Sequence, residues 1–333
     1  KKRLSDNNAT PCSPFGCRVF YKGAYHMQTA KKRRKDLKKN LPLLLLTVPG
    51  LIYLIINNYM PMFGIFIAFK QMDYAKGLFG SPWCGLANFK FLFASNQAGI
   101  MIRNTVLYNL AFILLGTFFA VLIAVLMSEI VQMGCAKFFQ AGLVMPNLIS
   151  MVIVSYIVYA FLSPENGLFN ALIISLGGDP ISWYTEEKWW PLILVVTQIW
   201  KTAGYSSIVY IASISGIDPS LYEAARIDGA GKLQQIFRIT LPQLKSIITI
   251  MLLMSCARIF ASDFGLFYQV PQNSGALYNV TQTIDTYVYR GLMQNGDLGM
   301  SSAAGLFQSV LGFILVMTAN FLVRKADNES ALF

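Results

Sequence analysis

The chain has 333 residues, of which 55% are hydrophobic and only 13% are charged. Because soluble domains carry about 25% charged residues, this composition excludes a soluble globular protein and predicts an integral membrane protein. The formal net charge of +11 is compatible with nucleic acid or an anionic membrane surface as a partner, and the position of the charges decides between them.

Residues 1–40 form a basic tail that holds 12 of the 27 Lys and Arg residues and ends in the run KKRRKDLKK. A basic flank before the first apolar segment is typical of membrane orientation, so membrane lipid is the expected partner and nucleic acid is not. Residues 1–26 differ in character from the rest, which makes Met27 a candidate start. The first apolar segment is long and lacks a small-residue cleavage site, so no cleavable signal is predicted.

Six segments are long and apolar enough to cross a membrane, for which about 20 residues are needed. They cover residues 41–68, 105–128, 138–162, 189–214, 246–267 and 302–323. The first contains Pro49, Pro61 and several glycines, which predicts a kink or break at residues 59–64. Residues 41–325 are thus one transmembrane domain, followed by a short C-terminal tail at 326–333.

The distribution of basic residues orients these spans. An even number of spans places both termini on one side, and that side carries 19 Lys and Arg residues against 6 on the other. The positive-inside rule therefore predicts cytoplasmic termini and a cytoplasmic segment at 218–245. Long outer loops are expected at 70–103, 163–188 and 268–300, and the tryptophans at span ends are interpreted as interface anchors.

Several polar side chains fall inside the fourth and fifth predicted spans. A charge at the bilayer centre costs about 2.5–3.5 kcal/mol on insertion scales, so these groups should face protein or water. On one regular helix Arg258 and Asp263 would not share a face, so a direct pair is not expected. We interpret the set as a polar translocation path. The alternative is structural pairing with the neighbouring subunit, or snorkelling to an interface, and it is favoured for Lys201. The predicted path comprises Gln198, Trp200, Lys201, Tyr205, Arg258 and Asp263.

The segment 218–245 between the fourth and fifth spans has the pattern of a compact helical hairpin. Asp218 can cap a helix whose first residue is Pro219 and which ends near Asp228. Gly229 and Gly231 then allow a sharp turn. A second helical run follows at 232–239, before Leu241-Pro242 lead into the next span. Such an ordered hairpin predicts a docking element.

Enzyme chemistry is not predicted for this chain. The only histidine, His26, lies in the tail, and the five cysteines show no CxxC spacing, so no metal site is expected. A Walker A motif ending at Lys232 would need Gly where Arg226 stands and Ser or Thr where Leu233 stands. No GxSxG or HExxH motif occurs either, so no catalytic residue is expected.

The hairpin carries a specific resemblance to a known family. Its sequence is similar to the cytoplasmic EAA loop of ABC importer permeases, and the similarity extends over residues 43–325. The resemblance implies contact with an ATPase subunit by Glu223, Ala224, Ala225, Asp228, Gly229, Ala230, Phe237, Leu241 and Pro242. Segments 58–73, 198–230, 285–292 and 303–325 are most similar to permeases for polysaccharide-derived oligosaccharides such as alginate or pectin fragments.

This resemblance implies an all-α integral membrane protein with the six transmembrane helices of the type I ABC importer permease fold and a cytoplasmic coupling helix. It implies a bacterial inner-membrane location and import of oligosaccharides from an external solute-binding protein by alternating access. The other partners implied are a second, related permease chain and two ATPase subunits, which would bind ATP and Mg²⁺. This chain itself is then expected to hold no cofactor.

Other readings of the sequence remain open. A permease for another solute class, such as peptides or amino acids, would share the EAA loop. A secondary transporter often shows internal repeats with broken helices, but no repeat is evident here and the EAA loop would be unexplained. A membrane-embedded enzyme would need clustered carboxylates, His or Cys at membrane depth, and the sequence does not supply them.

Overall fold

The computed structural model describes residues 41–42, 45–90, 96–130 and 133–326. The predictions made for the basic tail at 1–40 lie outside these residues, as do nearly all of those for the C-terminal tail. Within the described ranges the secondary structure is helical, apart from one isolated bridge between Lys70 and Trp83. Five helices are long and apolar enough to cross a membrane, and a bent helix pair raises the number to six if the pair is one span. The all-α prediction is therefore confirmed, and the six predicted spans match this number when the bent pair is one span.

The chain divides into a first unit up to Gly64 and a second unit from Ile65 onward. In the first unit, residues 45–54 are helical and lead into a π-helical turn, η1 (Ile55–Tyr59), and α2 (Met60–Met62). A 3₁₀ segment, η2 (Phe63–Phe69), follows. The irregularity predicted at 59–64 is confirmed, because the helix changes from π to α to 3₁₀ geometry across these residues.

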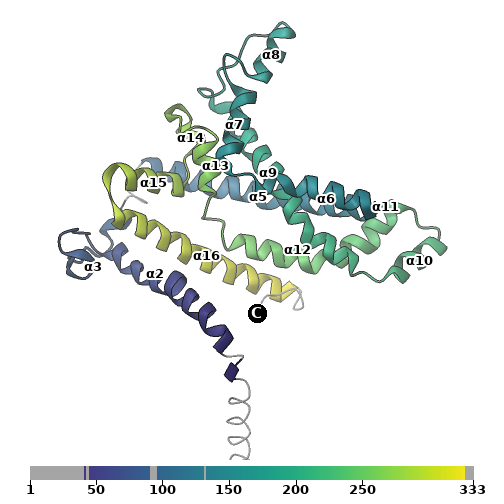
Figure 1. Ribbon diagram of the computed structural model, residues 1–333, viewed down its shortest axis with the longest axis horizontal. Coiled ribbons are helices and arrows are strands. Elements are labelled where there is room, and N and C mark those ends of the chain that lie inside the picture. The colour runs from purple at the N-terminus through teal and green to yellow at the C-terminus, as the bar shows by residue number, and fades with distance from the viewer. Residues whose placement is uncertain (1–40, 43–44, 91–95, 131–132, 327–333) are drawn as a thin grey trace, which may run out of the picture. The chain divides into compact units, whose positions relative to one another are not determined.

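The second unit contains the remaining elements (Figure 1). Their bounds are α3 (Gly77–Gly80), η3 (Ala87–Phe89), α5 (Asn96–Ser128), α6 (Met133–Leu148), α7 (Met151–Leu162), α8 (Leu168–Ser175), η4 (Glu187–Trp189), α9 (Trp190–Ser215), α10 (Pro219–Ile227), α11 (Lys232–Gln235), η5 (Ile236–Thr240), α12 (Leu241–Cys256), α13 (Phe264–Gln269), η6 (Gly275–Leu277), α14 (Tyr278–Thr281), α15 (Ile284–Asn295) and α16 (Leu298–Ala326).

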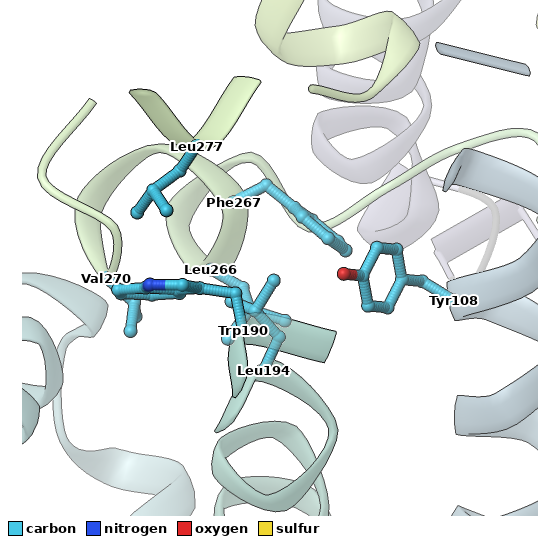
Figure 2. Close-up of a cluster of buried hydrophobic side chains, with 7 residues drawn as sticks. All are labelled: Tyr108, Trp190, Leu194, Leu266, Phe267, Val270 and Leu277. Carbon is cyan, nitrogen blue, oxygen red and sulfur yellow. The ribbon is translucent and has the colours of Figure 1, made fainter. Parts of the chain in front are cut away.

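Helices α5 and α9 form the central pair of this unit. Near their starts, Tyr108 of α5 belongs to the same buried cluster as Trp190 of α9 (Figure 2). Near their ends, the fully buried Ala124 of α5 shares a cluster with Tyr210 of α9. The two helices therefore run in the same direction, and small residues allow their backbones to approach closely. Trp190 was interpreted as an interface anchor, but it is fully buried and belongs to this core.

The third predicted span, 138–162, is not one helix. It consists of α6 and α7, which meet at an angle of 96°. Pro146 lies inside α6 and removes a backbone donor from its last turn. Ser150 then starts α7, with its hydroxyl accepting a hydrogen bond from the Ile153 amide at 3.4 Å. A proline followed by a capping serine thus ends one helix and begins another.

The fifth predicted span, 246–267, is also interrupted. Helix α12 begins at Leu241, directly after the π-helical turn η5, and ends at Cys256. Residues 257–263 leave the helix, and Asp263 caps the start of α13 through a 3.2 Å hydrogen bond from the Leu266 amide. The expectation that Arg258 and Asp263 sit on one regular helix was therefore wrong. Both belong to this break, which we call the 257–263 break.

Candidate translocation cavity and hairpin

A cavity of about 740 Å³ lies between α5, α9, α12 and the 257–263 break. Four residues of the predicted path line it: Gln198 and Tyr205 on α9, and Arg258 and Asp263 on the break. They come from two segments that are far apart in the sequence, so the fold brings the predicted set together. Because turns and irregular backbone interrupt the helix at this break, Arg258 and Asp263 reach the same cavity although a regular helix would separate them.

The other two predicted path residues, Trp200 and Lys201, are not in the cavity wall. The Lys201 ammonium donates to the carbonyls of Pro146 and Asn147 at 3.3 Å and also to that of Ile149. These carbonyls lie at the end of α6, where the helix leaves them without intrahelical partners and where the dipole favours a cation. The structure thus gives Lys201 a role in holding the α6–α7 bend of its own chain, which was not foreseen from the sequence.

The cavity wall combines apolar and uncharged polar side chains, with aromatic faces. Hydroxyl and amide side chains come from all three helices and the break, among them Asn109, Thr117, Thr202, Ser206, Ser255 and Ser262. Phe112 and Tyr210 add ring surfaces. The Oε1 atom of Gln198 is buried and has no hydrogen-bond partner among the described residues. Such a wall suits a ligand rich in hydroxyl groups, which both donate and accept hydrogen bonds.

Side chains from neighbouring helices satisfy the backbone groups that the 257–263 break leaves unpaired. Asn109 of α5 donates to the carbonyls of Ile259 at 2.9 Å and Ala261 at 3.0 Å. Gln308 of α16 donates to the carbonyl of Phe260 at 2.8 Å. Because unpaired carbonyls at membrane depth cost several kcal/mol each, these amides fix the path of the break.

A carboxylate holds the other side of the same break. Asp285 of α15 accepts from both the amide and the hydroxyl of Ser262, at 2.7 and 2.6 Å. Its second oxygen accepts from Gln308 at 3.2 Å. We call Asn109, Asp285 and Gln308 the break clamp. Sequence reasoning did not assign these residues a role, although the Ser262-Asp263 pair is a helix-start signal that could have revealed the break.

The segment 218–245 forms the predicted hairpin at the end of α9. The Asp218 carboxylate accepts from the Ser220 amide at 2.9 Å, and this bond holds the pKa of Asp218 below its usual range. Helix α10 begins at Pro219, as predicted, and ends at Ile227. Gly229 has φ +79°, a left-handed conformation that other residues rarely adopt. The predicted helix start and glycine turn are confirmed.

Internal hydrogen bonds make the hairpin compact. The Ala230 amide donates to the Ala225 carbonyl at 2.8 Å, and the buried Gln235 side chain donates to the Ala230 carbonyl at 2.9 Å. The Tyr222 and Thr240 hydroxyls are 3.0 Å apart, which links α10 to η5. Lys232 also forms an ion pair with Glu129, just beyond the end of α5. The hairpin therefore has a fixed shape of its own.

The hairpin nevertheless exposes a large apolar surface. Ile227, Leu233 and Phe237 are 87%, 71% and 66% exposed. Of the residues predicted for ATPase contact, Glu223, Ala224, Asp228, Gly229, Phe237 and Pro242 are exposed, whereas Ala225, Ala230 and Leu241 are half-buried. An ordered polar hairpin with exposed apolar side chains is typical of a docking surface.

Long apolar helices around a polar cavity, with a compact hairpin at one end, define a membrane transport subunit. The chain belongs to the family of binding-protein-dependent transport system inner membrane components, which matches residues 113–328. Members of this family are permease subunits of ABC transporters and not enzymes.

Three similar proteins show how far the similarity extends. The chain is 37% identical over 305 residues to the polygalacturonan/rhamnogalacturonan transport system permease protein YteP of Bacillus subtilis (strain 168), covering 90% of this chain and 94% of that one. It is also similar to a chain in the crystal structure of a bacterial ABC transporter that imports the acidic polysaccharide alginate. The TM-score is 0.79 at 33% identity, covering 89% of this chain and 99% of that chain. A second structure of a bacterial alginate transporter, in complex with an alginate pentasaccharide-bound periplasmic protein, gives 0.78 at 33% identity, covering 88% and 97%. The predicted type I permease fold is confirmed.

The break clamp leads to a stability prediction. Asp285→Ala removes the acceptor of two Ser262 donors and one Gln308 donor, so the purified protein should lose about 1–3 kcal/mol of stability, the cost of unsatisfied buried groups. Thermal unfolding in detergent measures this loss. Asp179→Ala in the segment 176–186, where the carboxylate is exposed, is the control and should leave unfolding unchanged. Equal melting temperatures for Asp285→Ala, Asp179→Ala and the wild type would show that Asp285 does not hold the break.

Proposed function

We propose that this chain is one of two different permease chains in an ATP-driven importer of oligosaccharides released from polysaccharides. The observation that carries the proposal is the cavity, whose wall combines hydroxyl, amide and aromatic groups between the transmembrane helices. Its size, about 740 Å³, is that of sites for small organic ligands. The similarity to permeases for polygalacturonan/rhamnogalacturonan and alginate supports the same substrate class.

The family depends on a binding protein, and the alginate relative was crystallised with a periplasmic protein that carries a pentasaccharide. By the same scheme, an external solute-binding protein delivers the oligosaccharide to the outer segments of this chain. The second permease chain completes the cavity, and two ATPase subunits bind ATP and Mg²⁺ below the hairpin. The bacterial inner membrane is the expected location.

The hairpin transmits the ATPase movement in this scheme. Its exposed apolar side chains enter a cleft of one ATPase subunit, where the small Ala224 and Gly229 allow close approach. Glu223 and Asp228 supply polar contacts at the same surface. ATP binding and hydrolysis then bias the permease between inward-open and outward-open states, a two-state transition.

This function requires the hairpin and both termini to lie in the cytoplasm, as the basic residues predict. Cysteines introduced singly at Asp228 and Asp179 provide the test with a membrane-impermeant thiol reagent. The cysteine at 179 should react in intact cells, and the cysteine at 228 only after the membrane is opened. Labelling of the cysteine at 228 in intact cells would reverse the proposed orientation.

The hairpin turn leads to a coupling prediction. Gly229→Asp places a side chain and a charge in a left-handed turn, at a cost of about 1–2 kcal/mol. We expect less copurified ATPase per permease and weaker substrate-stimulated ATP hydrolysis in liposomes. Glu223→Ala, which removes a polar contact, should have a smaller effect of the same kind.

Gly231→Asp is the matched control for charge. Gly231 has an ordinary φ of −69° and caps α11, a position that Asp suits. The Gly231→Asp variant should therefore retain the hairpin shape and more of the coupling than Gly229→Asp. Wild-type copurification and stimulation in Gly229→Asp would refute a coupling role for the turn.

Reconstitution tests the transport function itself. This chain, its partner permease, the ATPase and the solute-binding protein are placed in liposomes, and ATP hydrolysis is measured with oligosaccharides or with peptides of similar mass. Stimulation by oligosaccharides is the expected result. Stimulation by peptides alone would support the other permease class, and copurification of no ATPase would favour an ATP-independent transporter.

A further inference from the structure

Arg258 is the one cation among the residues that line the cavity. Its side chain is exposed in the isolated chain. Within the described residues, the structure records no hydrogen bond or ion pair of its guanidinium; the two ion pairs found there join Lys76 to Asp73 and Lys232 to Glu129. Among the described residues, this cation therefore faces the cavity without an ion-pair partner.

The two nearest acidic residues in sequence are engaged elsewhere. Asp263, which also lines the cavity, uses Oδ1 to cap the start of α13. Asp285 lies on the far side of the break, where both of its oxygens accept hydrogen bonds from Ser262 and Gln308. Neither carboxylate lies within ion-pair distance of Arg258. The donors of the guanidinium therefore remain available to a group that enters the cavity.

The position of Arg258 is well defined by its surroundings. It directly precedes Ile259 and Phe260, whose carbonyls the break clamp holds through Asn109 and Gln308. A guanidinium presents a planar fork of N–H donors that matches a carboxylate and can bind both of its oxygens at once.

We propose that Arg258 is a carboxylate-binding subsite and that the cavity selects anionic oligosaccharides, those built from uronic acids. The proposal rests on the proposed import of oligosaccharides and specifies the chemistry of that substrate. Arg258 binds the carboxylate of one sugar unit, while the neutral polar wall, including Gln198, binds the hydroxyl groups. Asp263 opposes anions in the same cavity and so limits how tightly the carboxylate is held.

The alternative is that the guanidinium of Arg258 pairs with a carboxylate of the second permease chain. In that case Arg258 would join the two chains and its loss would affect every substrate alike. A carboxylate subsite predicts the opposite, a loss confined to anionic saccharides. Methyl esterification removes the charge of a uronate and keeps the sugar, so oligogalacturonate and its methyl ester are a matched pair of probes.

The experiment measures equilibrium binding of both probes to the complete transport complex in nanodiscs. The solute-binding protein is left out so that its own preference does not enter. Arg258→Gln should lower the affinity ratio of oligogalacturonate to its ester by about tenfold to a hundredfold, as expected for loss of a charged hydrogen-bonded pair. Arg258→Lys keeps the charge without the fork and should lower the ratio less.

Asp263→Asn is the matched variant that should change the affinity ratio in the opposite direction. It removes a negative charge that repels the uronate and keeps a residue that caps helices well, so the affinity ratio of oligogalacturonate to its ester should rise. An unchanged ratio in Arg258→Gln, or an equal loss of both probes with less copurified partner permease, would overturn the proposal. Oligosaccharide-stimulated ATP hydrolysis, measured separately on the wild type, decides whether import itself stands, so the two failures are distinguishable.

Discussion

A helix that is interrupted inside a membrane leaves backbone carbonyls and amides that water cannot reach, and this constraint organises the second unit of the chain. At the end of α6, Lys201 donates to three carbonyls of the α6–α7 bend. At the 257–263 break, Asn109, Gln308 and Asp285 supply the missing partners. Each interruption is thus satisfied by side chains of other helices, so the breaks also fasten those helices to one another.

The breaks explain why the cavity has a polar wall. A continuous fifth span would present one side chain per 100° of rotation and would place Arg258 and Asp263 on different faces. The turns and irregular backbone at 257–263 instead bring both residues, with Ser262, into the wall of the cavity beside α5 and α9. The same side chains would be costly on a helix facing lipid. The polar wall and the clamp that supports it therefore depend on each other.

Local signals in the sequence were sufficient for the hairpin but not for the breaks. The start of α10 follows from Asp218 and Pro219, and the turn follows from Gly229, because capping and left-handed turns depend on adjacent residues. The path of the 257–263 break depends on Asn109, which is 150 residues from Ile259 in sequence. Apolar periodicity cannot report such contacts, so the fifth span looked continuous, and the role of Asp285 could not be foreseen.

A continuous helical run connects the hairpin to the cavity. Residues Lys232–Cys256 form one helical run of 25 residues, about 37 Å long, from the hairpin to the residue two before Arg258. Beyond the break, Leu266 and Phe267 of α13 are fixed in the buried cluster with Tyr108 and Trp190 (Figure 2). In the proposed mechanism, a displacement of the hairpin would pass along this helical run to the 257–263 break, beyond which the buried cluster holds α13 in place. The seven residues of the break lie between the two and would absorb the displacement, and they include Arg258 and Asp263, the charged part of the cavity wall.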